Sequence, residues 1–193
     1  MSEYHYLTRR QFQLVANLYV PAILLTYTYG NFFSRHIVRV SNRWQRERNE
    51  YAHAMDNIGG GMVASQNAFY ATRPLVDYLG GCTRIKLWYP RTMTPDAAAG
   101  VLARIGDALK APWYRRIYDA PGIIGQWLGN TIGVGRAIQV PGIYYCSERV
   151  VSHFAPWMQI RAKASPADID RYCTAHPDWA CFGVYDPNLE AET

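Results

Sequence analysis

Residues 51–66 read YAHAMDNIGGGMVASQ, and this stretch decides the fold class. A strand-like run from Tyr51 to Ile58 is followed by three glycines and by a second strand-like run from Met62 to Gln66. Glycine adopts the positive φ angles that tight turns between antiparallel strands need, so the pattern predicts a β-hairpin. The glycines do not form a phosphate-binding loop, because no Lys-Ser/Thr pair follows them and a strand comes next.

Further strands and helices are expected on both sides of this hairpin. Apolar runs and stripes predict strands at 22–27, 85–89 and 184–185 and helices at 8–19 and 32–44. Thr94 and Ser165 each precede a proline and can cap a helix N-terminus, which predicts one helix to about residue 109 and another after Ser165. A helix also begins around Cys146, while the charged stretch 45–50 and the glycine-rich stretch 122–142 are expected to be loops. The mixture predicts an α+β fold, with helices on an antiparallel sheet of about five or six strands.

Composition limits the classes of protein that remain. Of the 193 residues, 49% are hydrophobic and 18% are charged, which suits one folded core and excludes a disordered chain. The net charge of +5 permits an anionic partner, but no basic stripe interleaved with stacking residues indicates nucleic acid. Gln13, Asn17 and Pro21 interrupt the apolar stretch near the N-terminus, so neither a signal peptide nor a membrane span is expected. We expect an N-terminal helical extension over 1–19, a main domain over 20–185 and an acidic tail over 186–193.

The cysteines are Cys82, Cys146, Cys173 and Cys181. None lies in a C-x-x-C pair, so we expect no metal site and no cofactor. Cys173 and Cys181 are close enough in sequence to bridge, but spacing alone leaves the free thiols as an alternative. Cys146 stands out because a helix is expected to begin there, and a helix N-terminus lowers a thiol pKa and offers N–H groups to an oxyanion. Cys146 is therefore the candidate nucleophile. Among the histidines His53 stands out, because a bulky core histidine would be a poor choice in a strand next to the glycine turn.

Other polar and aromatic residues have weaker indications. His153 follows Cys146 by seven residues, which on a helix is about 10 Å, beyond the reach of direct proton transfer. Trp113 and Tyr114 either line a substrate groove or pack within the fold, and packing is the simpler interpretation for each one.

Several short motifs occur in a fixed order along the main domain. They are Pro21-Ala22-Ile23-Leu24-Leu25, Ser34-Arg35-His36-Ile37-Val38-Arg39, Ala52-His53, Thr94-Pro95-Asp96, Tyr118-Asp119, Tyr145-Cys146-Ser147-Glu148 and Ser165-Pro166-Ala167-Asp168. This order resembles that of the circularly permuted papain-like amidases of the NlpC superfamily, of the YiiX/YaeF type, and more distantly the lecithin retinol acyltransferase group. The resemblance covers about residues 20–185 and implies a permuted papain-like fold with the nucleophile at a helix N-terminus. We expect this helix to meet the sheet face that carries His53.

The resemblance also implies roles for individual residues. Cys146 matches the nucleophile of the family and His53 matches its general base. The third position lies 12 residues after the histidine on the paired strand, which is Ser65 in this sequence. A serine hydroxyl can orient the imidazole without adding a charge. Gln66 takes this place instead if the strand register slips by one residue, although it would then point to the other face.

The function expected from this reading is cleavage of an amide or ester bond by a cysteine hydrolase. Peptidoglycan peptides are the first choice of substrate, because this superfamily often cleaves them, and lipid or acyl amides are the second. The alternative is a non-catalytic binding or structural module of an envelope or viral assembly that keeps the fold, such as a phage tail-type assembly. The compartment and the oligomeric state do not follow from the sequence.

Overall fold

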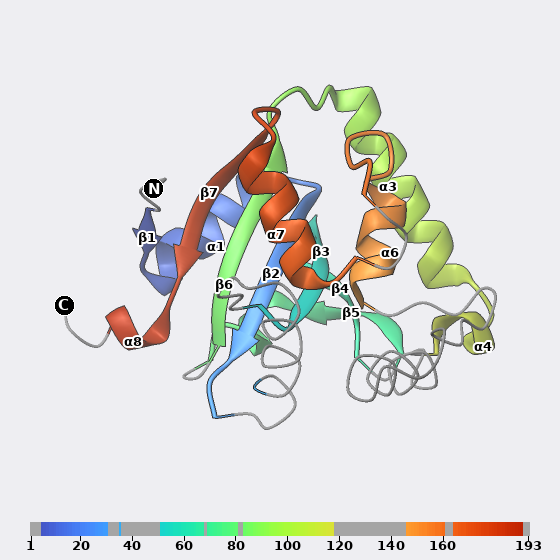
Figure 1. Ribbon diagram of the computed structural model, residues 1–193. Coiled ribbons are helices and arrows are strands. Elements are labelled where there is room, and N and C mark those ends of the chain that lie inside the picture. Colours follow the sequence, from blue (N-terminus) through green and yellow to red (C-terminus); the bar gives the residue numbers. More distant parts are fainter. Residues whose placement is uncertain are drawn as a thin grey trace, which may run out of the picture.

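The computed structural model describes residues 5–30, 35, 51–67, 69–80, 83–117, 146–160 and 164–190 (Figure 1). A seven-stranded sheet forms the centre of the fold, with strand order β1-β7-β6-β2-β3-β4-β5. The strands are β1 (Tyr6–Leu7), β2 (Ala22–Thr28), β3 (His53–Gly59), β4 (Met62–Gln66), β5 (Tyr70–Pro74), β6 (Thr83–Pro90) and β7 (Trp179–Tyr185). The α+β class expected from the sequence is therefore correct.

The expected sheet of five or six antiparallel strands was wrong in two details. β1 pairs with β7 in parallel, so the sheet is mixed, and β5 adds a further strand beside β4. Both missed strands lie at sheet edges, where short segments without a long apolar run are common. β1 has only two residues. β5 has one buried residue, Tyr70, and then alternates half-buried and exposed residues up to Pro74.

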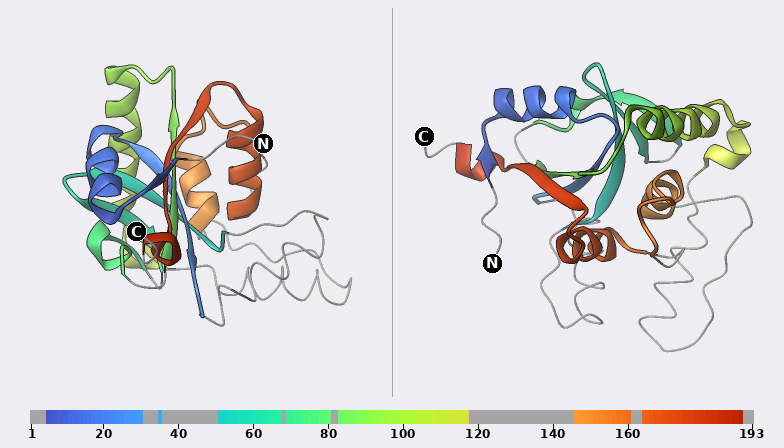
Figure 2. Two further views of the ribbon diagram at one scale, coloured as in Figure 1. Left: turned by 90° about the vertical axis from the view of Figure 1, so that its left-hand side faces the viewer. Right: turned by 90° about the horizontal axis from the view of Figure 1, so that it is seen from above.

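Helices cover both faces of the sheet, as Figure 2 shows. α1 (Arg9–Leu18) packs on one face, and α3 (Pro95–Lys110), α6 (Cys146–His153) and α7 (Pro166–Ala175) pack on the other. Shorter helices are η1 (Leu75–Asp77), α4 (Trp113–Arg116) and α8 (Pro187–Glu190). The two faces have separate apolar cores: Phe12 packs with Met55 and Val63 in one, and Val150 packs with Ala54 and Ala64 in the other.

The local signals in the sequence are confirmed at the hairpin and at three helix starts. Gly59, Gly60 and Gly61 all have positive φ angles, of 82°, 61° and 70°, which residues with a Cβ rarely adopt. Side chains cap the N-termini of α1, α3 and α7, and the capping residues are Thr8, Thr94 and Ser165. The expected helix over 32–44 (apart from Arg35), the loops over 45–50 and 122–142, and the residues Cys82 and Asp119 lie outside the described part of the chain.

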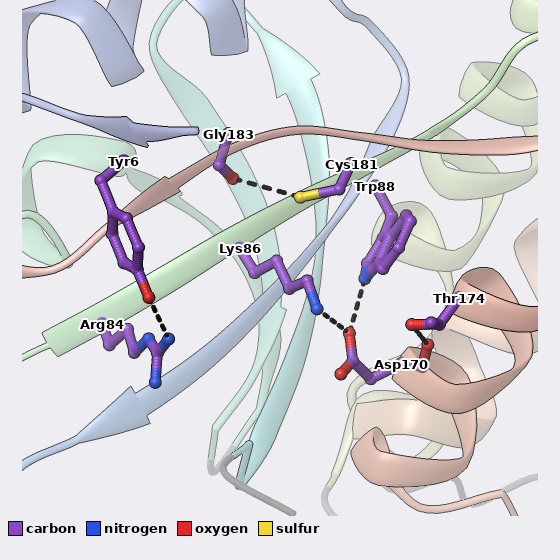
Figure 3. A network of polar contacts seen from close by, with 8 residues as sticks. All are labelled: Tyr6, Arg84, Lys86, Trp88, Asp170, Thr174, Cys181 and Gly183. Carbon is purple, nitrogen blue, oxygen red and sulfur yellow. Dashed lines mark hydrogen bonds and ion pairs between the residues drawn. The ribbon is translucent and has the colours of Figure 1, made fainter. Parts of the chain in front are cut away.

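A buried polar network fixes α7 to the centre of the sheet (Figure 3). Lys86 on β6 is 2% exposed, and its Nζ lies 2.8 Å from Oδ1 of Asp170 on α7. Trp88 Nε1 donates to the same oxygen at 2.8 Å, and the Trp88 ring lies 4.8 Å from the ammonium group. The buried cation therefore has both a counter-charge and an aromatic face, which offset its desolvation.

Cys173 and Cys181 lie beside this network as free thiols. Burial is the main cause that raises the pKa of each, and the Lys86 ammonium partly opposes it. Raised pKa values keep both groups protonated at neutral pH, so neither has the thiolate character of a nucleophile.

Candidate active site

His53 and Ser65 lie in direct contact on neighbouring strands. His53 is the first residue of β3, and its Nε2 lies 2.9 Å from Ser65 Oγ on β4. Met55 pairs with Ser65 in the hairpin register, so His53 sits diagonally from the serine on the same face of the sheet. The spacing of 12 residues noted in the sequence thus brings these two side chains together.

A chain of polar groups continues from Ser65 and sets the direction of the hydrogen bonds. Ser65 Oγ donates to Asn67 Oδ1 at 3.4 Å, and Asn67 Nδ2 donates to the Tyr78 hydroxyl at 3.3 Å. A serine hydroxyl has one proton, so Ser65 accepts from His53 when it donates to Asn67. In this arrangement His53 carries its proton on Nε2, and Nδ1 carries the lone pair.

The protonation state of His53 follows from its surroundings. The side chain is half-buried against the sheet, and this burial lowers the pKa of the imidazole from 6.5 to about 4. The imidazole is therefore neutral at pH 7 and able to accept a proton on Nδ1.

Gln66, the other candidate for the third position, points away from His53. Its Nε2 donates to the carbonyl oxygen of Arg116 at 2.8 Å, at the end of α4. Consecutive residues of a strand face opposite sides, so only one of Ser65 and Gln66 can meet the imidazole. The hairpin register selects Ser65.

Cys146 is the first residue of α6 and is 4% exposed. In the described part of the chain, α6 starts at Cys146. N–H groups in the first turn of a helix have no partner within the helix, and the helix dipole there favours a negative charge. This position is the one expected from the sequence.

His53 and Cys146 lie at the same end of the sheet, on different sides of it. Figure 1 shows α6 starting at the end of the sheet where β2 ends and β3 begins. α6 packs on the face that carries Ala54 and Asp56, whereas the alternation of β3 places His53 on the α1 face with Met55. We expected the nucleophile helix to meet the face that carries His53, and this expectation was wrong.

A buried polar cluster that the sequence did not reveal joins α6 to the sheet. Asp56 is fully buried, and its Oδ2 accepts from the Tyr70 hydroxyl at 2.7 Å and from His153 Nδ1 at 2.9 Å. The guanidinium of Arg149 lies 4.7 Å from the centre of the Tyr70 ring. Burial, followed by the Asp56 carboxylate, raises the pKa of Tyr70 well above its ordinary value, so the phenol keeps its proton and donates. In the sequence, this cluster is indicated only by Asp56, a charged residue in the middle of the buried strand β3.

Polar contacts from several other elements fix the position of α6. Ser147 Oγ donates to the carbonyl of Ala164 at 2.6 Å, and Arg149 Nη2 donates to the carbonyl of Arg115 at 2.8 Å. Arg104 on α3 donates to the carbonyl of His153 at 2.9 Å. Hydrogen bonds are directional, so these contacts define one position and one rotation for the helix that begins at Cys146.

Comparisons with known proteins supply no relative for this chain. No protein-family model matches the sequence, and no curated protein matches it. Among the residues that the structure describes, no three His, Cys, Asp or Glu side chains are grouped so that they could hold a metal ion. Across the same residues, no helix has the length and apolar character needed to cross a bilayer.

Proposed function

We propose that this protein is a cysteine hydrolase that cleaves an amide or ester bond, with Cys146 as nucleophile and His53 as base. The observation that carries the proposal is the 2.9 Å contact between His53 Nε2 and Ser65 Oγ, together with the neutral state of the imidazole. Within the described part of the chain no side chain hydrogen-bonds Nδ1, which can then accept a proton. An imidazole held by a hydroxyl through one nitrogen and basic at the other is the arrangement that general-base catalysis needs.

The proposed reaction has two chemical steps. The Cys146 thiol gives its proton to His53 Nδ1, and the thiolate attacks the carbonyl carbon of the substrate. N–H groups in the first turn of α6 stabilise the oxyanion, and the imidazolium gives its proton to the leaving amine or alcohol. Water then adds to the thioester with His53 as base, which releases the acid and restores the thiol. Ser65 keeps the ring in place and accepts from the imidazolium.

The substrate proposal follows the family resemblance. Peptide amides of peptidoglycan are the first choice, and lipid or acyl amides are the second. The net charge of +5 suits a polymer that carries carboxylates, although this does not separate the two classes.

Thiol alkylation as a function of pH tests the proposed pair without requiring a known substrate. We expect iodoacetamide to modify Cys146 with a pH profile that changes in the His53→Gln variant, because the proton acceptor is removed. Cys173→Ala and Cys181→Ala variants serve as matched controls, since both thiols lie away from His53 and should leave the profile unchanged. Superimposable profiles for His53→Gln and the wild type would refute the pairing of Cys146 with His53.

One observation favours a second candidate, a non-catalytic binding or structural module. α6 packs on the face opposite to His53, so the thiol has to approach Nδ1 past the first residue of β3. A binding or structural module does not need the Cys146 thiol to reach His53 Nδ1, so this arrangement would not impair it. An ordinary thiol pKa near ~8.5 for Cys146, together with an unchanged profile in His53→Gln, would support the module.

A further inference from the structure

A short basic and aromatic segment lies on the surface at the end of α3. Residues 110–116 read KAPWYRR, with three cations, two aromatic residues and no acidic residue. Trp113 is 64% exposed and Tyr114 is 52% exposed, although large aromatic side chains are mostly buried in folded proteins. Lys110 and Arg115 are exposed as well.

A third exposed aromatic residue comes from another part of the chain. Phe69, just before β5, is 48% exposed, and its backbone forms a bridge with Ile117, directly after α4. The bridge places Phe69 beside the end of the segment that carries Trp113 and Tyr114. We call Phe69, Lys110, Trp113, Tyr114 and Arg115 the aromatic–basic surface. Figures 1 and 2 show α4 projecting at the edge of the molecule, far from β1 and β7.

The backbone under this surface is firmly held. The carbonyl of Arg115 accepts from Arg149 on α6, and the carbonyl of Arg116 accepts from Gln66 on β4, each at 2.8 Å. The N–H of Arg115 also donates to the carbonyl of Pro112 at 2.9 Å. Among the described residues, the exposed rings therefore project from a backbone that α6 and β4 hold in place.

We propose that the aromatic–basic surface docks on an anionic lipid bilayer. Trp and Tyr have an apolar ring and a polar end, which suits the boundary between lipid chains and head groups. Lys110 and Arg115 supply positive charge for anionic head groups, and the chain as a whole carries +5. The Trp113 and Tyr114 rings stand at 83° to each other with centroids 6.2 Å apart, so the two rings do not form one shared flat platform. This inference concerns a binding surface and is independent of any reaction at Cys146.

Co-sedimentation of the full chain with vesicles tests the proposal. The vesicles contain two parts phosphatidylcholine to one part phosphatidylglycerol, and pure phosphatidylcholine vesicles are the comparison. We expect binding to the anionic vesicles to weaken strongly between about 0.1 M and about 1 M salt, because salt screens the attraction. Binding that is equal on neutral vesicles, or no binding at low salt, would overturn the proposal.

Matched double variants locate the contact. Trp113→Ser with Tyr114→Ser, or Lys110→Gln with Arg115→Gln, should each lower the partition coefficient by about tenfold or more. Controls on α1 remove two exposed apolar or two exposed basic side chains: Leu14→Ser with Leu18→Ser, and Arg9→Gln with Arg10→Gln. Leu14 and Leu18 are 58% and 77% exposed, so the control changes should not disturb the core.

The controls also define the results that would overturn the assignment. If the α1 variants lost as much vesicle binding as the variants of the aromatic–basic surface, the contact would lie elsewhere or would depend on net charge alone. If the Trp113 and Tyr114 variant lost binding to insoluble peptidoglycan and kept its binding to vesicles, the surface would be a glycan site and the lipid proposal would be wrong. Circular dichroism of each variant confirms that the fold is retained.

Discussion

Acidification is expected to destabilise the protein through His53. Burial lowers the pKa of this imidazole from 6.5 in the unfolded chain to about 4 in the folded protein. Between these two values the unfolded state binds a proton that the folded state does not bind, so the free energy of unfolding falls as the pH falls. The loss begins near pH 6.5 and is complete below about pH 4.

The size of the effect follows from the two pKa values. Each pKa unit corresponds to about 1.4 kcal/mol. The shift of His53 therefore lowers the free energy of unfolding, relative to neutral pH, by about 2 kcal/mol at pH 5 and by about 3 kcal/mol at pH 4. Losses of this size are a large fraction of the net stability of an ordinary domain. Carboxylates titrate over part of the same range, so the wild type alone cannot isolate the histidine.

Urea unfolding of the wild type and of His53→Gln at several pH values isolates the contribution of His53 to the pH dependence of stability. Glutamine cannot titrate, and the other groups contribute nearly equally to both proteins. We therefore expect the difference in unfolding free energy to shift by about 2 kcal/mol in favour of the variant between pH 7 and pH 5. His176→Gln serves as the control, because His176 is exposed and its ring stacks on Tyr172. A difference that stays constant with pH would refute the reasoning that His53 is buried in its neutral form.

Three further changes test other parts of the structure. Ser65→Ala should lower kcat/KM on any verified substrate, with a loss of about 1–2 kcal/mol in transition-state stabilisation, and Gln66→Ala should lower it less. Steady-state kinetics of the two variants measures both effects, and a larger loss for Gln66→Ala would contradict the hairpin register. Asp56→Ala should cost about 3–5 kcal/mol in urea unfolding because it leaves a buried imidazole and a buried phenol without their acceptor, and Asp56→Asn should cost less. Gly183→Ala should lower Tm, because a Cβ at this position would overlap the Leu7 side chain and displace β1 from β7; an unchanged Tm would show that β1 adds little stability.

The parts of the fold that depend on neighbouring residues were predictable from the sequence. The glycine turn, the capping residues Thr94 and Ser165 and the apolar run of β2 each act within a few residues, and each formed the expected element. For the contact of His53, the family resemblance indicated Ser65 and left Gln66 as the alternative, because the strand register depends on the geometry of the turn. The observed register brings Ser65 to the imidazole.

The contacts that depend on distant residues were not predictable in the same way. Asp56 and His153 are 97 residues apart, and neither residue type in isolation indicates its partner. A carboxylate in the middle of a buried strand does indicate that some partner is needed, since an unpaired buried charge is costly. The identity of that partner depends on how α6 packs, which local patterns do not specify.

The buried cluster around Asp56 bears directly on the choice between the two candidate functions. His153 and Arg149 bind α6 to β3 and β5 through polar groups that are costly to separate once buried. A helix held in this way cannot slide or rotate freely to bring Cys146 closer to His53. If the hydrolase proposal is correct, the thiol and Nδ1 must therefore meet around the start of β3, with the substrate carbonyl entering at that end of the sheet. If the module proposal is correct, the same cluster serves to hold α6 and, through Arg149, the backbone of α4 in one arrangement.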